Sequence, residues 1–268
     1  MASVISYSLF GYGQRNENSF EFNSYLRGFT LNLRLARLVY PDWKVKIHTD
    51  SFDYFPDIFK LCEYAICTPA PLTLAMLWRL KPCFESYERV ICRDLDSPLT
   101  LREAKCVKYW EQSGKAAHAI TDSISHTIPM MGGMVGFVPA HFREKTGFQT
   151  WDEIHGYNWE QKGADQTFLN NEIYPKFAQP GWDSITQHYL KGMPNTWLSD
   201  YHTQVPEMEY LEDMAESNDT CGHIGAAGWY EGALMKFLRK HKDKFTDILE
   251  AEKNYPEIFY WTQDGTFD

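Results

Sequence analysis

A short apolar segment that runs directly into two acidic residues constrains this chain more than any other feature. Residues 88–100 have the sequence ERVICRDLDSPLT, in which the run VIC suits a buried strand and the Ser-Pro pair ends it. Asp94 and Asp96 follow the strand with one residue between them. Because alternate residues of an extended chain point the same way, both carboxylates can face one cleft at the carboxyl end of the strand.

Two carboxylates directed at one point repel each other unless a cation lies between them. Mg²⁺ and Mn²⁺ prefer such oxygen ligands and keep positions for water and for substrate phosphates. The motif alone leaves a second interpretation open, a solvated loop with two surface acids, since Asp-x-Asp occurs often by chance. The rest of the chain must decide between a metal site and a surface loop.

Composition limits the class of protein. The 268 residues are 44% apolar and 16% aromatic, which suffices for a sizeable core and disfavours disorder. Lys and Arg number 26 against 36 Asp and Glu, so the net charge is −10 and nucleic acid is not expected as a partner. The six cysteines include no Cys-x-x-Cys pair, so we expect reduced thiols and no structural zinc.

The chain shows no sign of a secretory or membrane segment. The amino terminus lacks the basic and apolar regions of a signal peptide. No apolar stretch approaches the about 18 residues that a membrane helix needs. We therefore expect a cytoplasmic protein with no transmembrane segment, and peripheral contact with a membrane stays open.

Strand and helix patterns alternate along the chain. Strands are expected at residues 4–10, 43–48, 64–67, 90–92, 116–121 and 129–139. Helices are expected at residues 19–39, 55–62, 73–87, 101–113, 163–170, 230–241 and 246–253, with no prediction between 176 and 219. Alternation of this kind predicts a mostly parallel sheet. No linker or repeat divides the chain, so one domain is expected.

Five motifs follow one another in an order that resembles the GT-A fold glycosyltransferases. The resemblance is closest to the metal-dependent, retaining branch of glycogenin-like and galactosyltransferase-like enzymes. The motifs are Trp78-Arg79-Leu80, the strand ending in Asp94 and Asp96, residues 132–137 (GGMVGF), Asp165-Gln166 with residues 168–170, and His223 in a glycine-rich loop. The resemblance extends over about residues 3–230.

The resemblance implies an α/β fold. We expect a single GT-A (Rossmann-like) domain over residues 1–268, with a mostly parallel mixed central sheet flanked by helices. The nucleotide-binding half would comprise about residues 1–100, and the acceptor and catalytic half about residues 101–268.

The same resemblance implies a glycosyltransferase that moves a sugar from a nucleotide-sugar donor, with UDP the expected base, to a glycan or other acceptor. It implies that Asp94, Asp96 and His223 hold the Mn²⁺ or Mg²⁺ that binds the donor diphosphate. An ordinary core or surface histidine is the competing interpretation of His223. The family's late loop also carries a phosphate-binding lysine, whereas this chain has Ala226-Ala227 there, so Arg79 is the expected substitute.

Further residues receive roles from the resemblance. Asp165 and Gln166 are the expected catalytic residues beside the anomeric carbon, with Asp122 as a third candidate, although Asp165 also suits a helix N-cap. The expected donor-binding and nucleotide-binding residues are Phe10, Gly11, Tyr12, Asp50, Arg79, Asp94, Gly132 and Gly133, and the expected acceptor-binding residues are His126, Trp182 and Trp229. An inverting enzyme would need a general base, for which Asp122 or His126 is available, so retention is expected and inversion stays open.

Two other functions stay open. A haloacid-dehalogenase-type phosphatase also has an apolar strand followed by Asp-x-Asp, with the first Asp as nucleophile. Such enzymes carry the motif near the start of the domain, whereas here ninety-three residues precede Asp94. A catalytically silent carbohydrate-binding protein on the same fold would retain the aromatic surface without needing the metal ligands.

Overall fold

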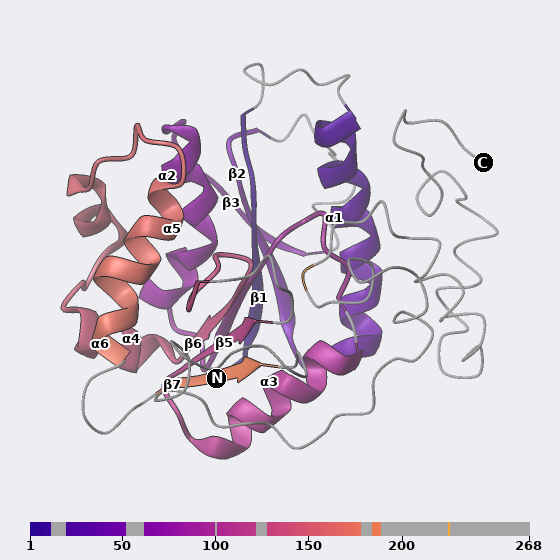
Figure 1. The fold of residues 1–268 in the computed structure, drawn as a ribbon. Helices are drawn as coiled ribbons and strands as arrows, with labels where there is room; N and C mark the ends of the chain where they lie inside the picture. Colours follow the sequence, from indigo (N-terminus) through magenta and orange to yellow (C-terminus); the bar gives the residue numbers. More distant parts are fainter. Residues whose placement is uncertain are drawn as a thin grey trace.

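The computed structural model describes residues 1–11, 20–51, 62–99, 101–121, 128–177, 184–188 and 225. A central sheet lies between two layers of helices (Figure 1). Within the described residues the sheet has seven strands in the order β3-β2-β1-β4-β6-β5-β7. The strands are β1 (Val4–Leu9), β2 (Lys44–Thr49), β3 (Glu63–Ile66), β4 (Val90–Arg93), β5 (Ala117–Thr121), β6 (Met134–Phe137) and β7 (Ser184–His188).

All neighbouring strands are parallel except at β6, which runs antiparallel to both β4 and β5. The expected α/β fold, with a mostly parallel mixed sheet flanked by helices, is confirmed. Since β1, β2 and β4 are parallel neighbours, their carboxyl ends meet at one edge of the sheet. The chain leaves this edge through Gly11, Asp50 and Asp94, and α/β sheets bind ligands beyond this edge.

Helices cover the two faces of the sheet separately (Figure 1). One face carries α1 (Phe20–Val39) and α3 (Leu101–Ser113), and the other carries α2 (Leu72–Met76), η2 (Leu77–Phe84), α4 (Pro139–Thr146), α5 (Ala164–Phe168) and α6 (Tyr174–Phe177). Strand alternation divides the core accordingly. Ile5 and Tyr7 join Phe29 of α1 in one apolar cluster, whereas Val4 joins Leu80 of η2 in another.

Three expected elements have different bounds in the structure. The helix expected at residues 73–87 is the short α2 followed by the 3-10 helix η2, in which Pro82 has no N–H to donate to an α-helical bond. The helix expected at residues 163–170 extends to Phe177, because a π-helical segment (η4, Leu169–Ile173) continues it into α6. The apolar stretch 129–139 contributes only Met134–Phe137 to the sheet.

Three further elements lie outside the strands and helices expected from the sequence, namely α4, β7 and the 3-10 helix η3 (Trp151–Gly156). The helix α4 begins with Pro139 and ends at Gly147, whose φ of 82° is left-handed, and both are recognisable signals of a helix start and stop. The strand β7 lies in the region without a prediction. The helices expected at 55–62, 230–241 and 246–253 fall wholly or almost wholly outside the described residues.

The structure bears on two expectations from the sequence, that no segment spans a membrane and that the cysteines are reduced. In the part of the chain that is described, no helix combines the length and the apolar character needed to cross a bilayer. Five cysteines fall within that part, and all five are free thiols. Four of the five are buried, where a thiol packs as a small apolar group.

Candidate functional site

A cavity of about 460 Å³ opens at the carboxyl edge of β1 and β4. Its wall is built from the end of β1, Tyr25 of α1, helix α2, the start of η2, the turn after β4 and the start of α5. The cavity brings together six residues predicted for the site, Phe10, Arg79, Asp94, Asp96, Asp165 and Gln166. It also contains Lys162, which was not predicted and which is exposed in the turn just before α5.

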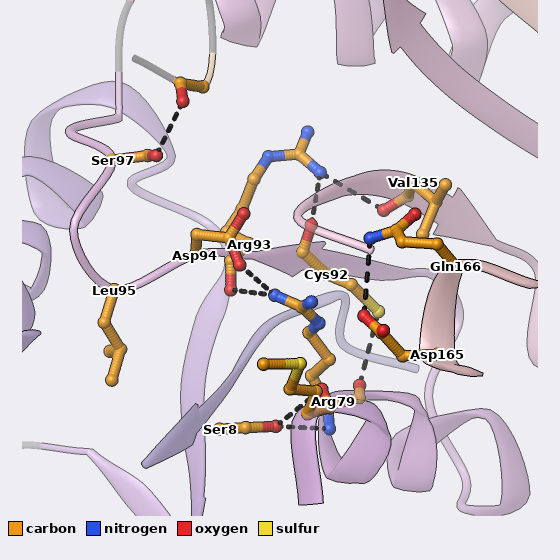
Figure 2. A network of polar contacts seen from close by, with 12 residues as sticks. Ser8, Arg79, Cys92, Arg93, Asp94, Leu95, Ser97, Val135, Asp165 and Gln166 are labelled. Atoms are coloured by element: carbon orange, nitrogen blue, oxygen red, sulfur yellow. Dashed lines mark hydrogen bonds and ion pairs between the residues drawn. The ribbon is translucent and has the colours of Figure 1, made fainter. Parts of the chain in front are cut away.

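Arg79 and Asp94 form an ion pair in the wall of this cavity (Figure 2). The Arg79 side chain is 7% exposed and the Asp94 side chain is 44% exposed. The backbone N–H of Arg79 donates to Ser8 Oγ at 2.9 Å, which fixes the start of η2 against β1. Burial disfavours the charged guanidinium, but the charge of Asp94 and its hydrogen bond raise the pKa of Arg79 above the ordinary value. Arg79 therefore stays charged.

Gly132 and Gly133, in the turn before β6, make room for this ion pair. A Cβ atom on Gly132 would overlap Arg79 Nη2, and one on Gly133 would overlap Asp94 Oδ2. A side chain at either position would displace a charged group. The resemblance implied that these glycines contact the donor. In the structure their Cα atoms face the ion pair, and a donor contact stays a prediction.

Asp165 lies in the first turn of α5 and is only 4% exposed, yet it lines the cavity. Burial raises the pKa of Asp165, while the nearby Arg79 guanidinium and backbone N–H groups lower it. The N-cap of α5 is Gly163, whose φ is 80°, so the alternative interpretation of Asp165 as the N-cap residue is wrong. Its carboxylate is thus held beside the ion pair by the helix.

Gln166 and Asn170, one helical turn apart, hold the loop that leads to Gly132. Asn170 Oδ1 accepts the Met130 N–H at 2.9 Å, and its Nδ2 donates to Met130 O at 2.8 Å. With its amide oriented to satisfy both ends, Gln166 donates to Met130 O at 3.1 Å and accepts the Gly132 N–H at 3.2 Å. Gln166 therefore supports the backbone of this loop as well as lining the cavity. Asn170 belongs to the motif quoted from the sequence but received no role there, although its spacing of four from Gln166 was an available signal.

Asp50, at the end of β2, supports the loop after β1. Its Oδ2 atom accepts the Gly11 N–H at 2.7 Å, and Gly11 has φ 91°, a conformation that favours glycine. The preceding residue, Phe10, lines the cavity and packs edge-to-face on Trp78 with ring centroids 6.1 Å apart. Phe10 and Gly11 are thus held at the edge of the cavity, and the nucleotide contacts expected of these residues stay predictions.

A second ion pair, which the sequence analysis did not predict, lies directly behind the cavity. Arg93 Nε donates to Glu103 Oε1 at 2.6 Å, and the Tyr40 hydroxyl donates to the same oxygen at 3.0 Å. Arg93 Nη1 also donates to the carbonyls of Cys92 and Val135, at 2.8 and 3.1 Å (Figure 2). These bonds connect β4 to α3, to β6 and to the end of α1, and so fix the strand that leads to Asp94.

The carboxylates of the cavity fit a divalent cation as a partial set of ligands. Asp94 and Asp96 both line the cavity, although Asp94 is already paired with Arg79. Across the described ranges, no group of three or more His, Cys, Asp and Glu side chains is placed to hold a metal. Mg²⁺ in particular is often held by one or two carboxylates together with substrate phosphates. The two aspartates therefore suit an ion that binds together with a nucleotide.

Six residues predicted for the site lie outside the described residues, and their roles stay predictions: Tyr12, Asp122, His126, Trp182, His223 and Trp229. Gly225 is described and belongs to the same glycine-rich loop as His223. It lines the cavity, and its carbonyl accepts a hydrogen bond from Ser97 Oγ at 3.0 Å (Figure 2). This part of the loop thus reaches the turn that carries Asp96.

No protein-family model and no curated protein matches the chain. Among solved structures, a protein of Desulfovibrio desulfuricans G20 described as a nucleotide-diphospho-sugar transferase is 15% identical, over 70% of this chain and 80% of that one, with a TM-score of 0.44. The apo-form glycosyltransferase GlyE of Streptococcus pneumoniae TIGR4 is 12% identical, over 69% and 45%, with a TM-score of 0.41. A 4-diphosphocytidyl-2C-methyl-D-erythritol synthase of Anaerococcus prevotii DSM 20548 is 14% identical, over 70% and 86%, with a TM-score of 0.44. These scores are below 0.5, so we draw no functional conclusion from the similarities.

Proposed function

We propose that the protein is a transferase that takes a sugar from a nucleotide-sugar donor, with UDP as the expected base, and passes it to a glycan or other acceptor. The observation that carries this proposal is the convergence of Arg79, Asp94, Asp96 and Asp165 in one cavity at the carboxyl edge of β1 and β4. Parallel α/β sheets bind nucleotides at this edge. The volume of about 460 Å³ also lies within the range of ordinary ligand pockets.

The charge of the cavity favours a divalent cation as part of the bound ligand. The described residues of its wall include three carboxylates, Asp94, Asp96 and Asp165, against two cations, Arg79 and Lys162. A nucleoside diphosphate is itself an anion and would be repelled by this balance. Mn²⁺ or Mg²⁺ held by the two aspartates, with His223 as the proposed third ligand, would stabilise the negative charge on the departing diphosphate as a Lewis acid.

Two cationic side chains of the cavity, Arg79 and Lys162, would bind the phosphates of the donor. Arg79 is a fixed positive charge with little exposure, and a charge oriented in advance in a site shielded from water acts strongly on a bound anion. Lys162 is an exposed cation at the cavity and can reach a phosphate without being held in place. It offers the lysine that the glycine-rich loop lacks.

The proposed chemistry at the anomeric carbon of the donor sugar falls to Asp165 and its neighbour Gln166. A carboxylate beside the reacting sugar can stabilise an oxocarbenium-like transition state or bind the sugar hydroxyls. Asp165 has the burial and the position for either task, and Gln166 keeps the adjacent loop in place. A retaining reaction is part of this proposal, and a base at Asp122 or His126 would mark an inverting one.

A thermal-shift panel of UDP-, GDP- and dTDP-sugars, each with and without Mn²⁺, tests the donor site. A ligand that binds only the folded state raises its melting temperature. We expect the largest rise with a UDP-sugar plus Mn²⁺, and a loss of that rise in Asp96→Asn. Asp152→Asn, an exposed acid outside the cavity, is the matched control. The donor site would be contradicted if none of these ligands produced a shift.

Product analysis separates transfer from the two alternatives. Release of UDP from the UDP-sugar, with the sugar appearing on an acceptor or on water, supports the transferase. Release of inorganic phosphate from a phosphate ester, without any nucleoside diphosphate, would indicate a phosphatase. Carbohydrate binding that persists without turnover, unchanged in Asp94→Asn and Asp96→Asn, would indicate a silent carbohydrate-binding protein.

A further inference from the structure

The turn that carries Asp96 is attached to helix α1 by one buried side chain. Asn32 is 0% exposed, and its Nδ2 donates to Leu95 O at 3.1 Å and to Ser97 O at 3.0 Å. Its Oδ1 accepts the Leu99 N–H at 2.9 Å. Both donor hydrogens and the acceptor of this amide are therefore used on the turn. No other residue type of this size offers two donors and one acceptor in the same plane.

Gly28 makes a second, independent contact on the same side of α1. It lies one turn before Asn32, and residues four apart share a helix face. A Cβ atom on Gly28 would overlap Leu95 O and would lie 3.0 Å from Asp96 Cα. The backbone of α1 thus packs directly against the backbone of the turn. Any larger residue must push the turn toward the cavity or the helix away from it.

Asn32 and Gly28 do not line the cavity. The turn that they contact does, through Asp94, Leu95, Asp96 and Ser97. The contact with α1 therefore lies behind the turn, and the ligand side lies in front. The carboxylate of Asp94 has its own support from Arg79 and from the space above Gly133. The Asp96 Cα, in contrast, lies directly over Gly28, between carbonyls that Asn32 binds.

We propose that Asn32 and Gly28 are positioning residues that set the Asp96 carboxylate for a divalent cation and the diphosphate bound with it. This inference rests on the proposed function and adds to it residues that no motif assigns. The physical basis is that groups behind a metal ligand orient it, and their loss typically lowers metal affinity by about 10- to 100-fold. A buried amide that holds three backbone groups leaves the turn little freedom to adopt another geometry.

Two substitutions test the contact in different ways. Asn32→Asp keeps the size and the acceptor for the Leu99 N–H, but places an oxygen against the carbonyls of Leu95 and Ser97. Gly28→Ala inserts a methyl group against the turn while favouring the helix itself, since Ala is the better helix former. A weaker site in Gly28→Ala cannot then be attributed to loss of α1. If Asn32→Asp does not fold, Gly28→Ala alone still tests whether the contact with α1 positions Asp96.

Each variant has a matched control. Gly156→Ala adds a methyl group where nothing lies within 4 Å. Gln149→Glu makes the same exchange of an amide for a carboxylate, at a side chain whose Nε2 donates to the carbonyls of Arg143 and Gly147, both at 3.3 Å, and which does not line the cavity. The controls thus reproduce the chemical changes away from the cavity.

Titration with Mn²⁺, alone and with UDP, followed by water-proton relaxation, measures the site without requiring turnover. We expect Asn32→Asp and Gly28→Ala to weaken Mn²⁺ binding in the presence of UDP by about 10- to 100-fold, and the controls by less than about twofold. Unchanged Mn²⁺ affinity in the two folded variants would overturn the positioning role while leaving the proposed function intact. Wild-type protein that binds neither Mn²⁺ nor UDP would overturn both.

Discussion

Two arginine–carboxylate pairs lie at consecutive residues of one strand end and differ in construction. In the core pair, Arg93 and Glu103, the side chains are 2% and 3% exposed. In the cavity pair, Arg79 and Asp94, the arginine is 7% exposed but the carboxylate is 44% exposed. The core pair has protein partners on several sides, whereas the cavity pair presents much of its carboxylate to solvent.

Their difference follows from the direction in which neighbouring residues leave an extended chain. Arg93 and Asp94 are adjacent, so their side chains point to opposite sides. Burying both charges of a pair carries a desolvation penalty that is recovered only with good geometry and additional hydrogen bonds. The core pair has those bonds, from Tyr40 and to two carbonyls. The cavity pair leaves much of its carboxylate exposed to solvent, so under the proposed function Arg93 serves stability and Asp94 serves binding.

The largest effect is expected from breaking the core pair. Glu103→Gln leaves the buried Arg93 without a compensating charge and should lower the free energy of unfolding by about 3–5 kcal/mol. Denaturant unfolding measures this change. The double variant Arg93→Met with Glu103→Leu removes both charges and should recover most of the loss. A loss below about 1 kcal/mol in Glu103→Gln would show that the pair is not the main support of this strand end.

Breaking the cavity pair should impair activity more than stability. Asp94→Asn should lower kcat with a UDP-sugar by about 100- to 1000-fold, the range for removing one preorganised electrostatic contact from an active site. Its free energy of unfolding should fall less than that of Glu103→Gln, because the introduced amide can still accept a hydrogen bond from Arg79 and the site is partly hydrated. Steady-state kinetics and denaturant unfolding measure the two effects. If Asp94→Asn lost more stability than Glu103→Gln and kept its activity, the proposal that the cavity pair serves binding and the core pair serves stability would be contradicted.

The glycine beside the cavity pair offers a smaller perturbation. In Gly133→Ala the added methyl group overlaps Asp94 Oδ2, so the carboxylate must move. Overpacking of this kind costs about 1–3 kcal/mol. We expect a reduced melting-temperature rise with UDP-sugar plus Mn²⁺, whereas Gly156→Ala should behave as wild type. Equal ligand shifts in both variants would mean that the position of Asp94 is not critical.

The smallest effect concerns pH. Burial raises the pKa of Asp165 and Arg79 lowers it, so Arg79→Gln should raise that pKa further. If the reaction needs ionised Asp165, the acid limb of the kcat/KM profile must then move to higher pH, because the carboxylate becomes protonated earlier as pH falls. Lys108→Gln, an exposed cation on α3, should leave the limb in place. An acid limb that stays or moves to lower pH in Arg79→Gln would show that the limb does not report an Asp165 carboxylate whose pKa Arg79 lowers.

Much of the fold was predictable because the signals are local. The bounds of α3 agree with the expected residues 101–113, and β1, β2 and β3 agree with their predictions to within one or two residues. Hydrophobic periodicity reports which way each side chain faces within one element, and that property needs no partner. For the same reason, alternation alone placed Asp94 and Asp96 at the end of a buried strand, and both line the cavity.

The tertiary structure alone decided which residues far apart in the sequence contact each other. Gly133 faces Asp94, Asn170 holds Met130, and Asn32 binds the turn at Leu95, across separations of about forty to sixty residues. No local pattern encodes such contacts, because they arise when whole elements pack and their unpaired polar groups must find partners. The two aspartates could thus be recognised from their spacing, but their separate supports, Arg79 for one and α1 for the other, exist only after the helices are packed on the sheet.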